Sequence, residues 1–149
     1  MELIFEQATA QDIPLLYRFN ADLITAYEDP AAVNFEKVLH WIHRKLSAQI
    51  QTYTRVLSGN SLVGYYRLVP CEDGLELDDF YILPSYRGQG IGSQILRRCC
   101  SSGKPIMLYV FSENTRAIAL YERFGFSVTE VVSATRCIMY RPATSQEDL

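Results

Sequence analysis

The segment from Leu75 to Ser93 constrains the fold of this 149-residue chain more than any other part. It begins with a run typical of a strand, Leu75 to Leu83, and then passes through Pro84 to three glycines at alternate positions between Gly88 and Gly92. Successive glycines let backbone N–H groups approach a ligand closely, and a helix start adds unpaired donors and the positive end of a dipole. A strand, a glycine turn and a helix in this order favour a phosphate or pyrophosphate site.

Two well-known phosphate loops do not match these glycines. A Walker A loop ends in Gly-Lys-Ser/Thr, which this chain lacks. A dinucleotide fingerprint needs Gly-x-Gly-x-x-Gly in the first strand–helix turn, whereas here the spacing is Gly-x-Gly-x-Gly and follows several strands. Glycines that serve only a tight turn remain an alternative at this point.

Periodicity and turn residues predict eleven elements in the order β-α-α-β-β-β-α-β-α-β-β. The strands are expected at 3–8, 53–57, 62–69, 75–83, 106–110, 126–132 and 135–139, and the helices at 9–27, 34–46, 88–100 and 114–124. Thr9 and Asn34 are the expected N-caps of the first two helices. The chain therefore reads as one α/β domain, residues 1–142, with a polar C-terminal tail, residues 143–149.

Composition excludes several classes. The chain is 48% hydrophobic and 21% charged, as in ordinary globular proteins, and its net charge of −3 argues against nucleic-acid binding. No apolar run is long enough for a membrane span, and the first residues do not resemble a signal peptide. The four cysteines form no Cys-x-x-Cys pair, so we expect reduced thiols, no metal site and a cytoplasmic location.

Two motifs together resemble those of the GNAT superfamily, the acetyl-CoA-dependent N-acetyltransferases. Arg87–Gly92 matches the signature Arg/Gln-x-x-Gly-x-Gly/Ala, and Asn114–Phe126 resembles the second signature, N-x-x-A-x-x-L-Y-x-x-x-G-F. The resemblance covers nearly the whole chain. It implies a GNAT-like mixed, splayed central sheet flanked by helices, and acetyl-CoA as cosubstrate without a metal.

The resemblance also implies the cofactor site. Backbone groups of Phe80 and Ile82 would pair with the pantetheine arm, with Tyr81 between them, and the amides from Gly88 to Ser93 would hold the pyrophosphate. Asn114 would lie against the same cofactor, although a plain helix N-cap is its alternative. The cofactor-binding residues expected on this basis are Phe80, Tyr81, Ile82, Arg87, Gly88, Gln89, Gly90, Ile91, Gly92, Ser93 and Asn114.

Three residues are candidates for catalysis. By resemblance, Tyr121 protonates the leaving thiolate; its alternative is a core tyrosine packed beside Phe124. An acceptor amine must lose a proton, and strand alternation places Glu76 and Asp78 on the face that also carries Phe80. Either carboxylate is a candidate base, Glu76 slightly favoured, and both could instead be solvated strand residues.

The expected function is transfer of an acetyl group to a primary amine of a small molecule or protein, by direct attack in a ternary complex. The alternative is a non-catalytic acyl-CoA-binding or sensing domain, and a longer acyl donor and a homodimer are also compatible with the resemblance. Tyr109 occupies the position at which the ribosomal-protein N-terminal branch carries a glutamate base, which argues against that branch. The acceptor region is expected around Tyr27, Glu28, Asp29, Phe35, Trp41 and Thr129–Thr135.

Overall fold

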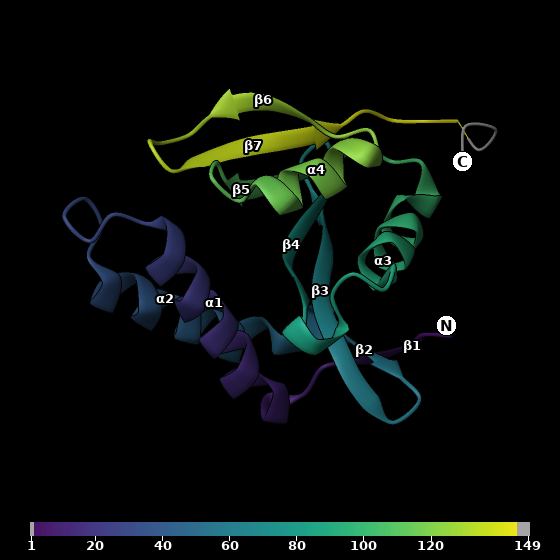
Figure 1. The fold of residues 1–149 in the computed structure, drawn as a ribbon, viewed down its shortest axis with the longest axis horizontal. Coiled ribbons are helices and arrows are strands. Elements are labelled where there is room, and N and C mark those ends of the chain that lie inside the picture. The colour runs from purple at the N-terminus through teal and green to yellow at the C-terminus, as the bar shows by residue number, and fades with distance from the viewer. Residues whose placement is uncertain (1, 146–149) are drawn as a thin grey trace. The chain divides into compact units, whose positions relative to one another are not determined.

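The computed structural model describes residues 2–145, and its main elements follow the predicted order (Figure 1). The strands are β1 (Ile4–Gln7), β2 (Tyr53–Ser58), β3 (Ser61–Cys71), β4 (Gly74–Ile82), β5 (Ile106–Phe111), β6 (Ser127–Val131) and β7 (Arg136–Arg141). The helices are α1 (Ile13–Tyr27), α2 (Phe35–Gln49), α3 (Ile91–Cys99) and α4 (Thr115–Arg123), with short 3-10 turns at Ala10–Asp12, Ile50–Thr52, Pro84–Tyr86 and Cys100–Ser102.

The strands form one mixed sheet in the order β1-β2-β3-β4-β5-β7-β6, which confirms the predicted fold class. β4 and β5 are parallel, whereas β1 with β2, β2 with β3, β5 with β7 and β6 with β7 are antiparallel. The chain divides into two compact units. The first runs to Arg67 and includes Asp79–Tyr81, and the second comprises Leu68–Asp78 and the chain from Ile82 onward.

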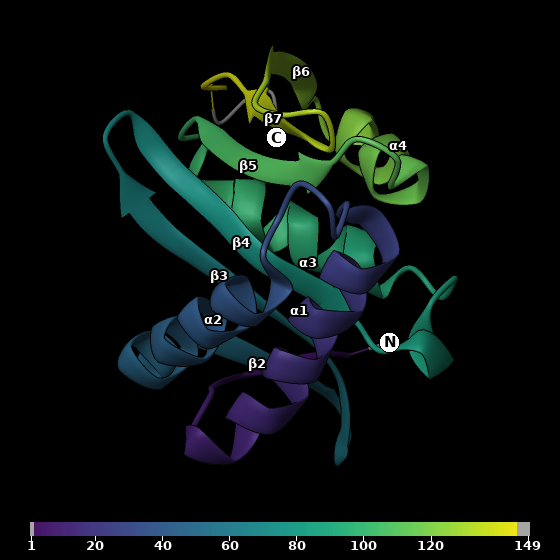
Figure 2. The same ribbon diagram turned by 90° about the vertical axis from the view of Figure 1, so that its left-hand side faces the viewer.

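In the first unit, α1 and α2 lie side by side and bury one apolar stripe each (Figure 2). Leu16 of α1 and Leu46 of α2 are fully buried, as helical spacing predicts. Thr9 is an N-cap as predicted, but it caps the 3-10 turn, so α1 begins at Ile13. Its Oγ1 accepts the N–H of Gln11 at 3.4 Å, and its own N–H donates to Oδ2 of Asp12 at 2.9 Å. Asn34 caps α2 as predicted by accepting the N–H of Lys37 at 3.1 Å.

In the second unit, β5 lies between β4 and β7. The parallel ladder pairs Leu75 with Ile106 and Glu76 with Met107, and it goes no further along the described strands. It starts beside Gly74, where an added Cβ would lie only 2.3 Å from the carbonyl oxygen of Pro105. That oxygen also accepts the N–H of Leu75 at 2.9 Å. β4 and β5 therefore pair through their first residues and do not pair beyond them. This is the splay that the resemblance implied.

Several predicted boundaries shift. The helix expected from Gly88 begins at Ile91, because Gly88 and Gly90 have φ of +77° and +80°. The last strand continues to Arg141. In the described part of the expected tail, the N–H of Thr144 donates to the oxygen of Gly103 at 2.9 Å, and residues 146–149 lie outside the described chain. Among residues 2–145, no helix combines the length and apolar character needed to cross a membrane.

Candidate functional site

The loop after β4 is braced by its own side chains. Pro84–Tyr86 form a 3-10 turn, and Nε of Arg87 donates to the carbonyl oxygen of Ile82 at 2.9 Å. The Gln89 amide donates to the oxygen of Ser85 at 3.3 Å. Both side chains predicted to bind cofactor therefore also hold the loop in shape.

Gly88 and Gly90 adopt the left-handed backbone conformation, and the space beside each of them is open. A Cβ added to either residue would meet no atom within 4 Å, so positive φ, and not crowding, is what requires glycine there. Gly90 is the N-cap residue of α3 and provides no capping side chain. The loop thus presents bare backbone at a helix start.

The start of α3 is suited to an anion. Gly90 accepts the N–H of Gln94 at 3.1 Å, which closes the first turn and leaves the N–H groups of Ile91 to Ser93 without partners inside the helix. Ile91 is buried and anchors this end. Arg97 and Arg98 lie in the last turn, at the opposite end from the glycines, so they do not add charge at the helix start. The donors available to an anion are therefore backbone groups.

Tyr121 lies on α4 and is 7% exposed. Its ring contacts that of Phe126 with centroids 5.7 Å apart, so the tyrosine packs in the core, as the alternative interpretation anticipated. Burial raises the pKa of the Tyr121 phenol, and the charges of Cys99 and Asp78 raise it further. The residue is therefore a neutral phenol at ordinary pH, and Asp78 lies near enough to act on it electrostatically.

Asn114 is the N-cap of α4. Its Oδ1 accepts the N–H of Ala117 at 3.4 Å, and its own N–H donates to the oxygen of Phe111 at 3.0 Å. The capping role anticipated as the alternative is thus present. Since capping uses the side-chain oxygen, the Nδ2 amide is the part of Asn114 that can serve a ligand.

Sequence reasoning missed the backbone at Asp79 in β4. Asp79 has φ of +48°, so the strand is not regularly extended there, and the alternation used to place Glu76, Asp78 and Phe80 on one face does not continue through it. Its Oδ2 accepts a 2.5 Å hydrogen bond from the hydroxyl of Tyr53, and Nζ of Lys45 lies 3.8 Å away. The only sequence signal is that aspartate tolerates left-handed backbone better than most residues.

The two residues that follow Asp79 belong to the same unit. The ring of Tyr81 stacks on Phe19 of α1, with centroids 3.8 Å apart and planes 22° from parallel. Tyr81 is therefore packed by its side chain. Its place in the cofactor site, between Phe80 and Ile82, stays a prediction.

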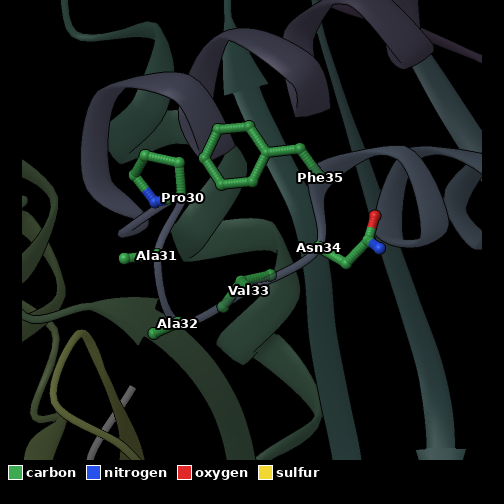
Figure 3. Close-up of a pocket in the computed structure, with 6 residues that line it drawn as sticks. All are labelled: Pro30, Ala31, Ala32, Val33, Asn34 and Phe35. Atoms are coloured by element: carbon green, nitrogen blue, oxygen red, sulfur yellow. The ribbon is translucent and has the colours of Figure 1, made fainter.

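The loop between α1 and α2 lines an open pocket of about 450 Å³ (Figure 3). It is lined by Pro30, Ala31, Ala32, Val33, Asn34 and Phe35. The rings of Pro30 and Phe35 both border it, and the Asn34 side chain points away toward α2, which it caps. Asp29 shapes the loop by accepting the N–H of Ala31 at 2.9 Å, and Trp41 is 54% exposed with Lys45 over its ring. Of the predicted acceptor residues, Phe35 is the one that lines this pocket.

All four cysteines are free thiols. Burial raises the pKa of Cys99 to about 12 and also raises that of Cys100, so these two are poor nucleophiles at neutral pH. Within residues 2–145, no three His, Cys, Asp or Glu side chains gather where they could hold a metal ion.

Known proteins resemble this chain in sequence and in fold. A family model described as "Acetyltransferase (GNAT) family" matches residues 16–126. A mycothiol acetyltransferase of Corynebacterium efficiens is 32% identical over 105 residues, which cover 60% of this chain and 35% of that protein. The N-alpha-acetyltransferase RimI of Mycobacterium tuberculosis is 34% identical over 92 residues, 56% of this chain and 57% of that one.

A solved structure extends the likeness to the whole fold. The PaiA N-acetyltransferase of Thermoplasma acidophilum, solved in complex with coenzyme A, has a TM-score of 0.64 and 19% identity, and covers 95% of this chain and 99% of its own. The chain spans about a third of the length of the mycothiol acetyltransferases it matches. The family match, however, extends from α1 through α4 and includes both signatures. The chain belongs to the acetyltransferase (GNAT) family.

Proposed function

We propose that this chain is an acetyl-CoA-dependent N-acetyltransferase that moves the acetyl group to a primary amine by direct attack in a ternary complex. The observation that carries the proposal is the bare backbone of Gly88 and Gly90 at the start of α3, within the same compact unit as the buried phenol Tyr121. The first feature suits a pyrophosphate, and the second suits a thiolate that leaves and needs a proton.

The cofactor would bind mainly through backbone. The N–H groups from Gly88 to Ser93 would hold the pyrophosphate, with Arg87 and Gln89 keeping the loop in shape through Ile82 and Ser85. The backbone of Phe80 and Ile82 would pair with the pantetheine arm, and the Nδ2 amide of Asn114 would donate to it. This division leaves the Asn114 oxygen to its helix cap.

Tyr121 would act as general acid. The departing thiolate of coenzyme A has an ordinary thiol pKa of about 8.5, so a neutral phenol can protonate it as the tetrahedral intermediate collapses. Burial keeps Tyr121 in the neutral form, which is the form that donates.

A carboxylate would act as general base, directly or through water. An alkylamine has a pKa of ~10.4, so presenting it neutral at pH 7 costs about 4–5 kcal/mol. Glu76 and Asp78 are the candidates. Asp78 is supported by its charge on Tyr121, and Glu76 by its position opposite Met107, where the β4–β5 ladder ends.

The acceptor would be an amine of a small molecule or of a protein. Names of similar proteins include both kinds, a mycothiol acetyltransferase and an N-alpha-acetyltransferase. The four free thiols suit a reducing compartment, and we propose the cytoplasm.

The test is release of free coenzyme A from acetyl-CoA against pools of amines, read by mass spectrometry so that protein thiols do not interfere. Release with one pool, with the acetylated amine detected, is the expected result. Acetyl-CoA binding without release from any pool would instead identify a non-catalytic acyl-CoA-binding domain. Asp78→Asn and Glu76→Gln then separate the bases, because only loss of the base moves the acidic limb of the pH–rate profile.

A further inference from the structure

One face of β5 and β7 carries an arginine on an exposed aromatic ring. Tyr109 lies between the buried residues Leu108 and Val110 of β5, so its side chain is on the opposite face of the strand, where it is 44% exposed. Arg136 is half-buried on β7, which pairs antiparallel with β5. Tyr109 lies opposite Ile138, two residues along from Arg136, so the arginine and the tyrosine are diagonal neighbours on one face.

The arginine is held in place by the ring. The guanidinium carbon of Arg136 lies 4.9 Å from the centre of the Tyr109 ring. Among the described residues, no carboxylate forms an ion pair with Arg136. A guanidinium stacked on an aromatic ring keeps its N–H donors at its edges, where they form a planar fork that matches a carboxylate. Arg136 is therefore an oriented cation that still has hydrogen-bonding capacity.

Tyr109 is close along the chain to residues assigned to acetyl transfer. Tyr109 comes two residues after Met107, at which the ladder with β4 ends, and five residues before Asn114. It thus occupies the stretch of β5 that no longer pairs with β4 and that leads to the cap of α4. All of these residues belong to one compact unit.

We propose that Arg136, oriented by Tyr109, binds a carboxylate of the acceptor, so the acceptor is a small amine that also carries a carboxylate, as an amino acid does. The inference rests on the proposed acetyl transfer and adds the class of its substrate. A bidentate guanidinium–carboxylate contact gives both energy and orientation, and it would fix the amine end of such a molecule relative to the thioester. Tyr109 supplies a flat support, and its hydroxyl is not needed.

The experiment compares acceptors that differ only in this carboxylate: lysine with lysinamide, β-alanine with β-alaninamide, and alanine with alaninamide. Arg136→Gln is expected to lower kcat/KM for the preferred carboxylate acceptor by roughly 10- to 100-fold and to leave its amide unchanged. Arg136→Lys should recover part of this loss, because it restores charge without the fork. Arg123→Gln, which removes an exposed arginine at the end of α4, is the matched control and should change neither acceptor.

The ring has its own pair of variants. Tyr109→Phe should keep the preference for the carboxylate, whereas Tyr109→Ala should reduce it as Arg136→Gln does. Each variant is compared with the wild type on the same acceptor before the acid and its amide are compared. The difference in amine pKa between acid and amide then cancels. Equal losses on both members of a pair, or no loss for Arg136→Gln, would overturn the proposal.

Failure of the inference and failure of acetyl transfer give different results. If the wild-type protein turns over amines without regard to a carboxylate, the substrate class is wrong and the transferase stands. If it turns over none of them, calorimetric titration of the coenzyme A complex with Nε-acetyl-lysine and its carboxamide still decides. Binding that requires both the carboxylate and Arg136 supports the anion site, and its absence overturns it.

Discussion

The hydroxyl of Tyr53 donates a 2.5 Å hydrogen bond to the carboxylate of Asp79, whose left-handed backbone directly precedes Phe80. A non-glycine residue in this conformation costs about 1–2 kcal/mol. The hydrogen bond, together with Lys45 at 3.8 Å, offsets that cost because the Asp79 side chain is only 11% exposed. The backbone that would pair with pantetheine is thus oriented by a tyrosine 26 residues earlier in the chain.

Tyr53→Phe should therefore lower both stability and cofactor affinity. Loss of a hydrogen bond to a part-buried carboxylate is expected to reduce the free energy of unfolding by about 1–3 kcal/mol and to raise the Kd for acetyl-CoA. Urea denaturation and calorimetry measure the two effects. Tyr17→Phe is the control, because within residues 2–145 its hydroxyl has no hydrogen-bond partner. Unchanged acetyl-CoA affinity in Tyr53→Phe would show that Asp79 does not orient the cofactor backbone.

Gly90→Ala and Gly59→Ala form a matched pair. Both glycines have positive φ, +80° and +60°, and a Cβ on either meets no atom within 4 Å, so each substitution should cost about 1 kcal/mol of stability from backbone strain alone. Only Gly90→Ala should weaken acetyl-CoA binding, because Gly59 lies in the hairpin between β2 and β3. Equal Kd values for the two variants would argue against a pyrophosphate at the start of α3.

Asn114→Ala and Asn34→Ala separate helix capping from ligand binding. Each asparagine accepts a helix N–H through Oδ1, at 3.4 Å and 3.1 Å, so each variant should lose about 1 kcal/mol of stability. Asn114→Ala should in addition raise the KM for acetyl-CoA. If both variants keep the wild-type KM, Asn114 is a cap and nothing more.

Tyr121→Phe should lower kcat about 100-fold, with little change in acetyl-CoA affinity, because the ring still fills its buried site. Since burial raises its pKa above the ordinary value of 10.0, Tyr121 keeps its proton through the alkaline assay range. Wild-type kcat should thus show no loss between pH 8 and pH 10 from ionisation of this phenol. Stopped-flow rates across that range, with wild-type circular dichroism as the folding check, would expose any other behaviour.

Alkaline pH should destabilise the fold. Cys99 has its pKa raised from 9.0 to about 12 by burial, and burial also raises the pKa of Tyr65 and Tyr121 above 10.0. Above these ordinary values the unfolded chain loses protons that the folded chain keeps, so the free energy of unfolding falls by about 1.4 kcal/mol per pH unit for each group.

Guanidinium denaturation at intervals from pH 7 to pH 11 measures this slope. Cys99 should contribute nothing to the slope below pH 8 and should make it negative from about pH 9. Cys99→Ala should therefore make the slope less steep between pH 9 and pH 10, by about the contribution of one titrating group. If Cys99→Ala has the same slope as the wild type, Cys99 ionises equally in the folded and unfolded states.

The sequence predicted well what depends on neighbours in the chain. Thr9 and Asn34 are N-caps, and the alternation of strands and helices is as expected, because caps and periodic apolar residues act within a few positions. The helix start at Ile91 was misplaced because the number of glycines that stay outside a helix depends on their φ.

Contacts between distant residues explain the rest. The strained backbone of Asp79 depends on Tyr53, and the position of Arg136 over Tyr109 depends on strand register between β5 and β7. Neither has a local pattern. Arg97 and Arg98 share a helix with the glycines, but the length of α3 places them at its other end.

The contact of Gly74 with Pro105 couples two turns that are far apart in the sequence. A side chain at position 74 would collide with the Pro105 carbonyl, and the same carbonyl begins the pairing of β4 with β5. An insertion or deletion in either turn would change which residues of β4 and β5 pair first. It would therefore shift the register of the residues that follow in both strands. During divergence these two turns are expected to keep their lengths together, so an enzyme engineer should transplant them as a pair.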